Sequence, residues 1–445
     1  MSHVFLFIVD SGLPAEHTSF AATTFAFLQV CRRWNEVAIA FPQLWVWWIP
    51  GTFKAWHLFK SRSKDAPLFL TWQEYLPESA HTVLMESETP KRIRQLDFSG
   101  TTHQFKCILN ALDSRSLSTT SSIRLRILRS SDGEHLARFS SFPFPKLSRL
   151  DVANFLPDLT SSIFVTSNLT SLKLDIPCPD GRYCTQSQLL QVLQQNRNLR
   201  QLNFKAGGLS LAGDSGRLVP ALLPHLADLK LSGTTEVIDR FLDLVCMSSP
   251  IHRITIHFQR NYAHDTEPLV IIMRKLLTMY YGCKELEPQR KVSHFTAFSD
   301  TGSIIAGDHL THPTYCLRLE FQNNKGELFQ KVIPLFPLNY ILDFTASGFD
   351  LATDAWRGIL LRMESLSHLR LERMNTESVL NALGPNDGGA HGERIQTIVI
   401  DHSRFHGQPR STGFPRTEIT VIRCPRILRR DDRKTVRSGR GDGQP

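Results

Sequence analysis

The sequence that decides the fold is Leu169-Thr170-Ser171-Leu172-Lys173-Leu174, in which a turn ending in leucine leads into a short alternating segment. Apolar residues at every second position predict a strand with one buried face, because successive side chains of a strand point to opposite sides. Similar segments recur at 93–98, 147–152, 199–204, 226–231, 251–256, 315–321, 366–371 and 395–400. Most of the chain is therefore expected to be a series of related strands.

The spacing of these segments predicts what lies between them. The central apolar residues at 150, 172, 202, 229 and 254 are separated by 22, 30, 27 and 25 residues. Helical apolar spacing fills stretches such as 186–195 and 236–247. Intervals of roughly 20–29 residues with one strand and one helix are typical of leucine-rich repeats, whose units bury their faces by stacking on their neighbours. We therefore expect an α/β fold, an irregular strand–helix solenoid.

The repeat is interrupted between about 259 and 312. This stretch contains a predicted helix at 268–281 and a segment with glycine, serine and aspartate. We interpret it as one degenerate repeat with an insertion.

The beginning of the chain has a different character, with six of the seven tryptophans in the first 72 residues. Apolar residues at helical spacing predict a helix over 27–41, which Pro42 ends because proline lacks a backbone donor and restricts the residue before it. A tryptophan-rich cluster occupies 44–48. A short helix is predicted at 53–59 and a strand at 67–72.

The net charge of +9 belongs mostly to the end of the chain. From Arg423 to Pro445, eight Lys/Arg residues stand against three aspartates, an excess of +5 that leaves about +4 on the rest. We expect a disordered basic tail from 403 and no nucleic-acid-binding fold in the body. The eight cysteines form no C-x-x-C pair, which is typical of reduced, buried thiols in a cytoplasmic or nuclear protein. No segment is long and apolar enough to predict a membrane span.

Motifs that carry chemistry are missing from the sequence. It contains no phosphate-binding loop, G-x-G-x-x-G, H-E-x-x-H or G-x-S-x-G. Cys178 and Cys184 lack two further ligands at a spacing that would complete a zinc site. We therefore predict a non-enzymatic protein without catalytic residues, cofactor or metal.

The run from Val30-Cys31-Arg32-Arg33-Trp34 to Phe41-Pro42-Gln43-Leu44-Trp45 resembles the second half of an F-box. The portion from Phe53 to Trp72 is similar to the F-box-like proteins abundant in mushroom-forming fungi, in which the box leads into degenerate leucine-rich repeats. The resemblance implies a helical module that binds a Skp-type adaptor, and through it a cullin–RING ubiquitin ligase, while the solenoid binds an unknown target protein. The adaptor-interface or box-core candidates are Val30, Cys31, Trp34, Val37, Leu44 and Trp45.

The resemblance divides the chain into four parts. These are an F-box-like module at 1–50, a junction helix and strand at 51–72, a degenerate solenoid at 73–402 and the basic tail at 403–445. F-boxes usually open with an L-P-x-E turn and a helix, whereas residues 4–8 resemble the interior of that helix, so we expect a truncated first helix. Two alternatives stay open: a solenoid interaction scaffold with a non-functional box, and, less favoured, a nucleic-acid binder acting through its tail.

Overall fold

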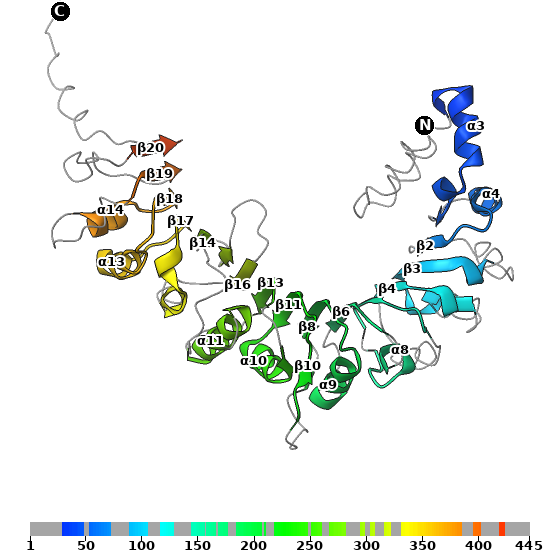
Figure 1. Ribbon diagram of the computed structural model, residues 1–445, viewed down its shortest axis with the longest axis horizontal. Coiled ribbons are helices and arrows are strands. Elements are labelled where there is room, and N and C mark those ends of the chain that lie inside the picture. Colours follow the sequence, from blue (N-terminus) through cyan, green and yellow to red (C-terminus); the bar gives the residue numbers. More distant parts are fainter. Residues whose placement is uncertain are drawn as a thin grey trace, which may run out of the picture. The chain divides into compact units, whose positions relative to one another are not determined.

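The computed structural model describes residues 29–48, 53–72, 89–105, 116–128, 144–155, 157–165, 168–176, 184–206, 209–210, 218–247, 251–259, 267–281, 294–298, 303–307, 316–321, 331–384, 395–401 and 418–422. Backbone contacts divide the chain into two compact units: Met1–Gly233 with Arg240–Ser249, and Thr234–Asp239 with Pro250–Pro445. The protein is mixed α/β with a largely parallel sheet, which agrees with the predicted α/β class (Figure 1).

The sheet of the first unit is parallel at every described pairing. Its strands follow one another in chain order: β1 (Trp47–Trp48), β2 (Leu68–Trp72), β3 (Ile93–Gly100), β4 (Ser122–Ile127), β5 (Arg149–Ala153), β6 (Ser171–Ile176), β8 (Gln201–Ala206) and β11 (Asp228–Gly233). Sequential parallel strands need a crossover between each pair. The described crossover segments include α8 (Ser162–Val165), α9 (Gln186–Gln195) and the 3₁₀ turns η2 (Pro90–Arg92) and η3 (Ser116–Thr119).

Two short parallel pairs lie outside the main sheet of this unit. They are β7 (Cys184–Thr185) with β9 (Leu209–Ser210), and β10 (Ala221–Leu222) with β12 (Val245–Cys246). The predicted helix at 236–247 is α10 (Thr235–Asp243), which ends earlier than expected because β12 follows it directly.

The recurrent leucines pair across the strands as their periodicity predicts. Leu150 is the partner of Leu172, which pairs with Leu202, which in turn pairs with Leu229. All four side chains are buried. The segments predicted at 147–152, 169–174, 199–204 and 226–231 start two residues before their strands, because their first leucines occupy the preceding turns and are buried there.

Hydrogen bonds at the strand starts connect each repeat to the next. The carbonyl of Ser148, for example, accepts from the N–H groups of both Thr170 and Ser171, at 2.8 and 3.0 Å. The Thr170 hydroxyl donates to the same carbonyl at 3.1 Å, and the Ser148 hydroxyl donates to Ser121 O at 3.0 Å. These hydroxyls add a side-chain hydrogen bond to carbonyls that already accept from two backbone N–H groups of the next repeat.

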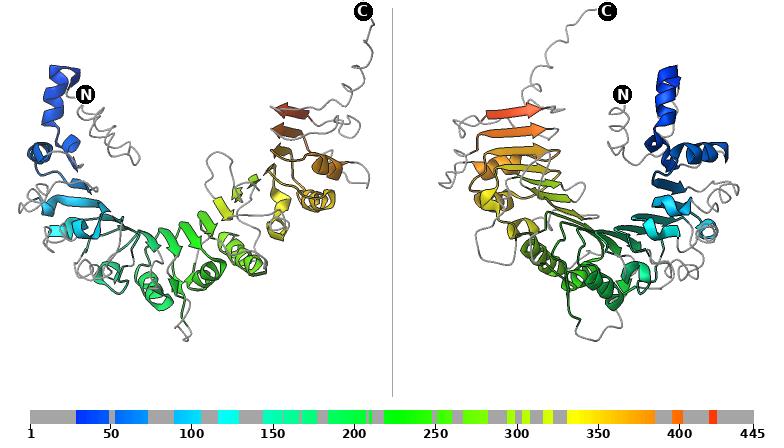
Figure 2. Two further views of the ribbon diagram at one scale, coloured as in Figure 1. Left: turned by 180° about the vertical axis from the view of Figure 1, so that it is seen from behind. Right: turned by 45° about the vertical axis from the view of Figure 1, so that its right-hand side comes forward.

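Helix α9 shows why the predicted crossover helix forms where it does. The Thr185 hydroxyl accepts from the N–H of Gln188, and the Gln188 side chain accepts from the N–H of Thr185, which makes a capping box. The helix covers one side of the sheet (Figures 1 and 2) and buries its apolar stripe. Asn196 ends it, and its buried amide donates to Phe164 O and Val192 O at 2.7 and 2.8 Å.

The second unit has a mixed sheet. Its strands, in spatial order, are β13 (Arg253–Phe258), β16 (Cys316–Phe321), β15 (Ser303–Gly307), β14 (His294–Phe298), β17 (Asp343–Ser347), β18 (His368–Glu372), β19 (Thr397–Asp401) and β20 (Glu418–Ile422). Strands β14 and β15 form an antiparallel hairpin, β15 is also antiparallel to β16, and the other described pairings are parallel.

The helices of the second unit are α11 (Glu267–Tyr281), α13 (Thr353–Leu361), α14 (Glu377–Leu383) and the 3₁₀ turns η5 (Ile333–Leu335) and η6 (Leu338–Tyr340). Buried Trp356 of α13 contacts Phe344 of β17, with ring centroids 6.3 Å apart. The predicted helix at 268–281 is α11. The interruption of the repeat also contains the β14–β15 hairpin, and the antiparallel pairing of that hairpin was not predicted.

The prediction of a disordered tail from 403 was wrong in one respect. Strand β20 lies within that stretch and continues the sheet by pairing in parallel with β19, for example Ile398 with Ile419. Its alternating apolar residues supply the same pattern as the earlier strands. The final predicted segment, 423–445, lies outside the described residues, and so does the predicted truncated helix at the N-terminus.

Candidate functional site

The N-terminal segment that resembles an F-box is a helix followed by a tight turn. Helix α3 (Arg32–Ala40) ends at Phe41, as the proline predicts, and Pro42–Trp45 form the 3₁₀ turn η1. The Trp45 indole N–H donates to Ala38 O at 2.8 Å. This bond satisfies a carbonyl near the helix end while the indole ring is buried, so Trp45 fixes the turn against the helix.

A second helix completes the surroundings of Trp45. Helix α4 (Phe53–Ser63) places Phe59 edge-on to the indole, with centroids 5.3 Å apart, and the Arg62 guanidinium 4.4 Å from the centre of the indole ring. Burial lowers the pKa of Arg62 from its usual value. This guanidinium therefore gives up hydration and gains a cation–π contact.

The six predicted adaptor-interface or box-core residues divide into three groups. Leu44 and Trp45 are fully buried, and Trp34 and Val37 are half-buried. Val30 and Cys31 are exposed, with 60% of Val30 accessible. The set therefore does not form a single surface. Ile39, which was not among the candidates, is a further exposed apolar residue of this helix, 40% accessible.

The tryptophans after the turn join this segment to the sheet. Trp47 and Trp48 form β1 and pair with Phe69 and Leu70 of β2. The Trp47 and Phe69 rings are stacked at 4.5 Å, and Phe69 N donates to Val46 O at 2.9 Å. The turn therefore runs directly into the first strand.

Arg92 connects the end of α4 to the strands beyond it. Its guanidinium donates to Ser63 Oγ at 2.7 Å and to Ala66 O at 2.9 Å. Burial lowers the pKa of Arg92, and the nearby Asp65 carboxylate opposes that change. The guanidinium thereby satisfies groups at a helix end, where backbone carbonyls lack partners within the helix.

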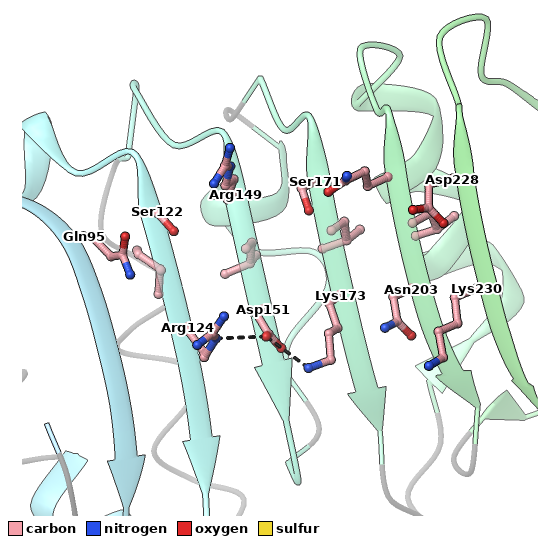
Figure 3. A pocket seen from close by; sticks show the side chains of 15 residues that line it. Gln95, Ser122, Arg124, Arg149, Asp151, Ser171, Lys173, Asn203, Asp228 and Lys230 are labelled. Atoms are coloured by element: carbon pink, nitrogen blue, oxygen red, sulfur yellow. Dashed lines mark hydrogen bonds and ion pairs between the residues drawn. The ribbon is translucent and has the colours of Figure 1, made fainter. Parts of the chain in front are cut away.

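We call the side of the first unit's strands that lies away from α9 the open face. A hollow of about 520 Å³ lies on this open face (Figure 3). Residues at matching positions of neighbouring strands line it in two rows. The first row is Gln95, Ser122, Arg149, Ser171, Gln201 and Asp228. The second row is Arg124, Asp151, Lys173, Asn203 and Lys230. These residues alternate with the buried leucines.

Ion pairs run along one side of the second row. Arg124 binds both Asp97 and Asp151, at 3.0 and 3.2 Å, and Lys173 binds Asp151 at 3.1 Å. The aspartate side chains are largely buried, whereas Arg124 and Lys173 remain about half and one-third exposed. Partial burial holds these charges in a fixed arrangement across four strands, although ion pairs with a partly exposed member add little stability.

Two cations of the hollow are not neutralised in this way. The side chains of Arg149 and Lys230 are exposed and have no ion-pair or hydrogen-bond partner among the described residues. Figure 3 shows them on separate strands, with Ser171 and Asn203 on the two strands between. The hollow therefore offers two separated positive charges among hydroxyl and amide groups, which suits recognition of a polar chain.

Sequence reasoning did not identify this hollow. The alternation around each central leucine marks the outward positions, but which outward residues become neighbours depends on the register between strands. Within the described residues, no group of three His, Cys, Asp or Glu side chains is arranged to hold a metal ion. The three thiols described are Cys184, which is buried as predicted, and Cys31 and Cys246, which are exposed, contrary to prediction.

No protein-family model matches the chain, and no curated protein matches it either. Of the described helices, none is long and apolar enough to cross a membrane.

Proposed function

We propose that this protein is a non-enzymatic substrate-recognition subunit of a cullin–RING ubiquitin ligase. In this proposal an F-box-like module, formed around α3 and η1, binds a Skp-type adaptor. The repeats of strands and helices form a degenerate leucine-rich solenoid that binds a target protein. The observation that carries the proposal is the direct attachment of the V-C-R-R-W…P-Q-L-W segment to the first strand of a parallel sheet built from leucine repeats.

The attachment suits the mechanism of such a subunit. A bridging subunit increases the effective concentration of target lysines near the conjugating enzyme, and that gain is largest when the connection holds one geometry. Trp45 fixes the turn to α3, and the stacked pair Trp47 and Phe69 fixes the turn to β2. A rigid seam therefore replaces a flexible linker between the docking module and the strands that would hold the target.

Exposed apolar residues of the module are the best candidates for the adaptor contact. Val30 and Ile39 are accessible, and Trp34 is half-exposed. Leu44 and Trp45 are buried, so their substitution would test the folding of the module and not its contact with a partner. An aspartate at such a position weakens the contact, because its charge would have to be desolvated where an apolar side chain was favourably buried.

The experiment is co-purification of the full chain with a Skp-type adaptor. The wild type should recover the adaptor. The double variant Val30→Asp, Ile39→Asp should bind the adaptor at least about tenfold more weakly, a change of about 1.4 kcal/mol in binding free energy. The matched control is Val219→Asp, Ile271→Asp, two exposed apolar residues elsewhere, which should leave recovery unchanged.

Two results would contradict the proposal. If the wild type recovers no adaptor, the ligase function fails for this chain, and an interaction scaffold with a non-functional box becomes the better description. If both double variants lose the adaptor equally, the binding does not depend on the module. Circular dichroism of each variant separates loss of contact from loss of folding.

A further inference from the structure

We infer that the hollow on the open face of the first unit binds an extended, acidic segment of a partner protein, with two carboxylates held by Arg149 and Lys230. The inference rests on the proposed function for its biological setting, because it names the chemistry of the target. Its physical basis is independent, since it depends on the charges that the hollow leaves unpaired.

The first step is the charge balance of the hollow. Of its four cations, Arg124 and Lys173 are engaged by Asp97 and Asp151. Arg149 and Lys230 have no side-chain partner among the described residues. A carboxylate brought to either cation gains a charge-assisted hydrogen bond without displacing an existing ion pair.

The second step is the spacing of these two cations. Arg149 pairs in register with Ser171, Ser171 with Gln201 and Gln201 with Asp228, so Lys230 lies three strands away and two residues further along. With about 4.8 Å between strands and about 3.3 Å per residue, their Cα atoms are separated by roughly 16 Å. An extended peptide covers that distance in about five residues. Side chains on one face of an extended segment are an even number of positions apart, so two acidic residues four positions apart, about 13 Å, lie within side-chain reach of both cations.

The third step is the lining between the two cations. Ser171, Gln201 and Asn203 lie between them and offer hydroxyl and amide groups. Such groups can both donate to and accept from a peptide backbone, which an extended segment leaves unpaired. Apolar side chains of the ligand would gain little here, because the leucines beneath are already covered.

A continuous polyanion fits the same surface less well. Single-stranded nucleic acid carries a phosphate on every nucleotide, so its charges would also fall beside Asp151 and Asp228. The Asp151 carboxylate already binds Arg124 and Lys173 through Oδ2, so a phosphate beside it would compete for cations that are engaged. Like charges in proximity are unfavourable, so carboxylates among the lining cations favour a ligand with isolated charges over a continuous polyanion.

The test measures fluorescence anisotropy of the full chain with a fluorescein-labelled Gly/Ser/Thr peptide that carries two glutamates four positions apart. Binding should weaken at least about tenfold when both glutamates are replaced by glutamine, and also with the protein variant Arg149→Glu, Lys230→Glu. The matched control is Arg94→Glu, Arg200→Glu, which changes the net charge equally at exposed cations outside the hollow. This control should retain at least half of the affinity.

Three outcomes would overturn the inference. These are no binding of the peptide to the wild type, an equal loss in the control variant, or oligo-dT binding that is as tight and as sensitive to Arg149→Glu, Lys230→Glu. Adaptor co-purification with the same variants keeps the two proposals distinguishable. If the adaptor is retained while the peptide fails to bind, only the inference about the target falls; if the peptide binds without the adaptor, only the ligase proposal falls.

Discussion

Replacing Asn196 with alanine should destabilise the first unit by about 2–4 kcal/mol. The Asn196 side chain is 1% exposed and joins three backbone groups. It donates to Phe164 O at 2.7 Å and to Val192 O at 2.8 Å, and it accepts from Leu169 N at 3.3 Å. One amide therefore links α8, the end of α9 and the turn before β6.

The magnitude depends on the loss at each backbone group. Val192 O keeps the Asn196 backbone N–H, at 3.2 Å, and loses little. Phe164 O and Leu169 N lose the partner that the side chain provides, and both belong to buried residues. An unsatisfied buried polar group costs about 1–3 kcal/mol, and two such groups are created here. The 3.3 Å bond to Leu169 N is the weaker of the two lost bonds, so the combined cost should lie in the lower part of the range for two groups, at about 2–4 kcal/mol.

Urea unfolding followed by circular dichroism measures the change through the midpoint and slope. Hydrogen exchange over 168–176 should also become faster, since Leu169 N loses its acceptor. Asn203→Ala is the matched control: its side chain lies on the open face without a partner among the described residues, so its effect should stay within about 0.5 kcal/mol. An Asn196→Ala effect no larger than that of the control would refute the reasoning.

Further predictions concern helix ends and glycines, each measured by the thermal midpoint of the full chain. Thr185→Ala removes the capping box of α9 and should cost about 1 kcal/mol, with Gln191→Ala, an exposed residue in the middle of the same helix, as the comparison. Gly358→Ala should stabilise α13 by about 0.5–1 kcal/mol, because a Cβ there meets nothing within 4 Å. Gly100→Ala should instead destabilise by about 1–3 kcal/mol, because its Cβ would lie 2.6 Å from the Gln104 Oε1 that accepts from Thr101 N. Equal effects at the two glycines would show that the space around the added Cβ does not decide whether the substitution stabilises or destabilises the protein.

The strands with leucine at the central position could be predicted from the sequence. A strand buried on one side needs apolar residues at alternate positions, and a parallel sheet in register needs them at the same position in every strand. Leu150, Leu172, Leu202 and Leu229 satisfy both conditions, so periodicity alone located them. The helix at 186–195 was equally visible, because its capping residues and its apolar stripe agree.

Other strands were missed for identifiable reasons. Strand β4 has the alternation Ile123, Leu125 and Ile127, a signal that could have found it but lacks the usual leucine-ended turn. Strand β17 buries Phe344 and Ala346 in place of two leucines, so it lacks the leucine pattern that marks the other strands. The antiparallel direction of β14 and β15 leaves no mark in either sequence, because alternation is the same for both directions.

The candidate sites could likewise be predicted from the sequence only in part. The motif around Trp34 and Trp45 located the helix and the turn, but burial separated Leu44 and Trp45 from exposed Val30. The hollow could not be predicted, because Arg149 and Lys230 are distant in sequence and come to line the same hollow only through the register of four strands.

The β14–β15 hairpin has a consequence for how the second unit folds. Its strands are joined by residues 299–302 and pair without any crossover, whereas each parallel neighbour must wait for a longer loop to close. Hairpins form in about 1–10 μs, and contacts between distant residues form more slowly because loop closure costs more entropy. We therefore expect the hairpin to form first and to present one edge to β16 and the other to β17. The hairpin that interrupts the repeat would then serve as the folding nucleus of the second unit, to which the parallel strands are added.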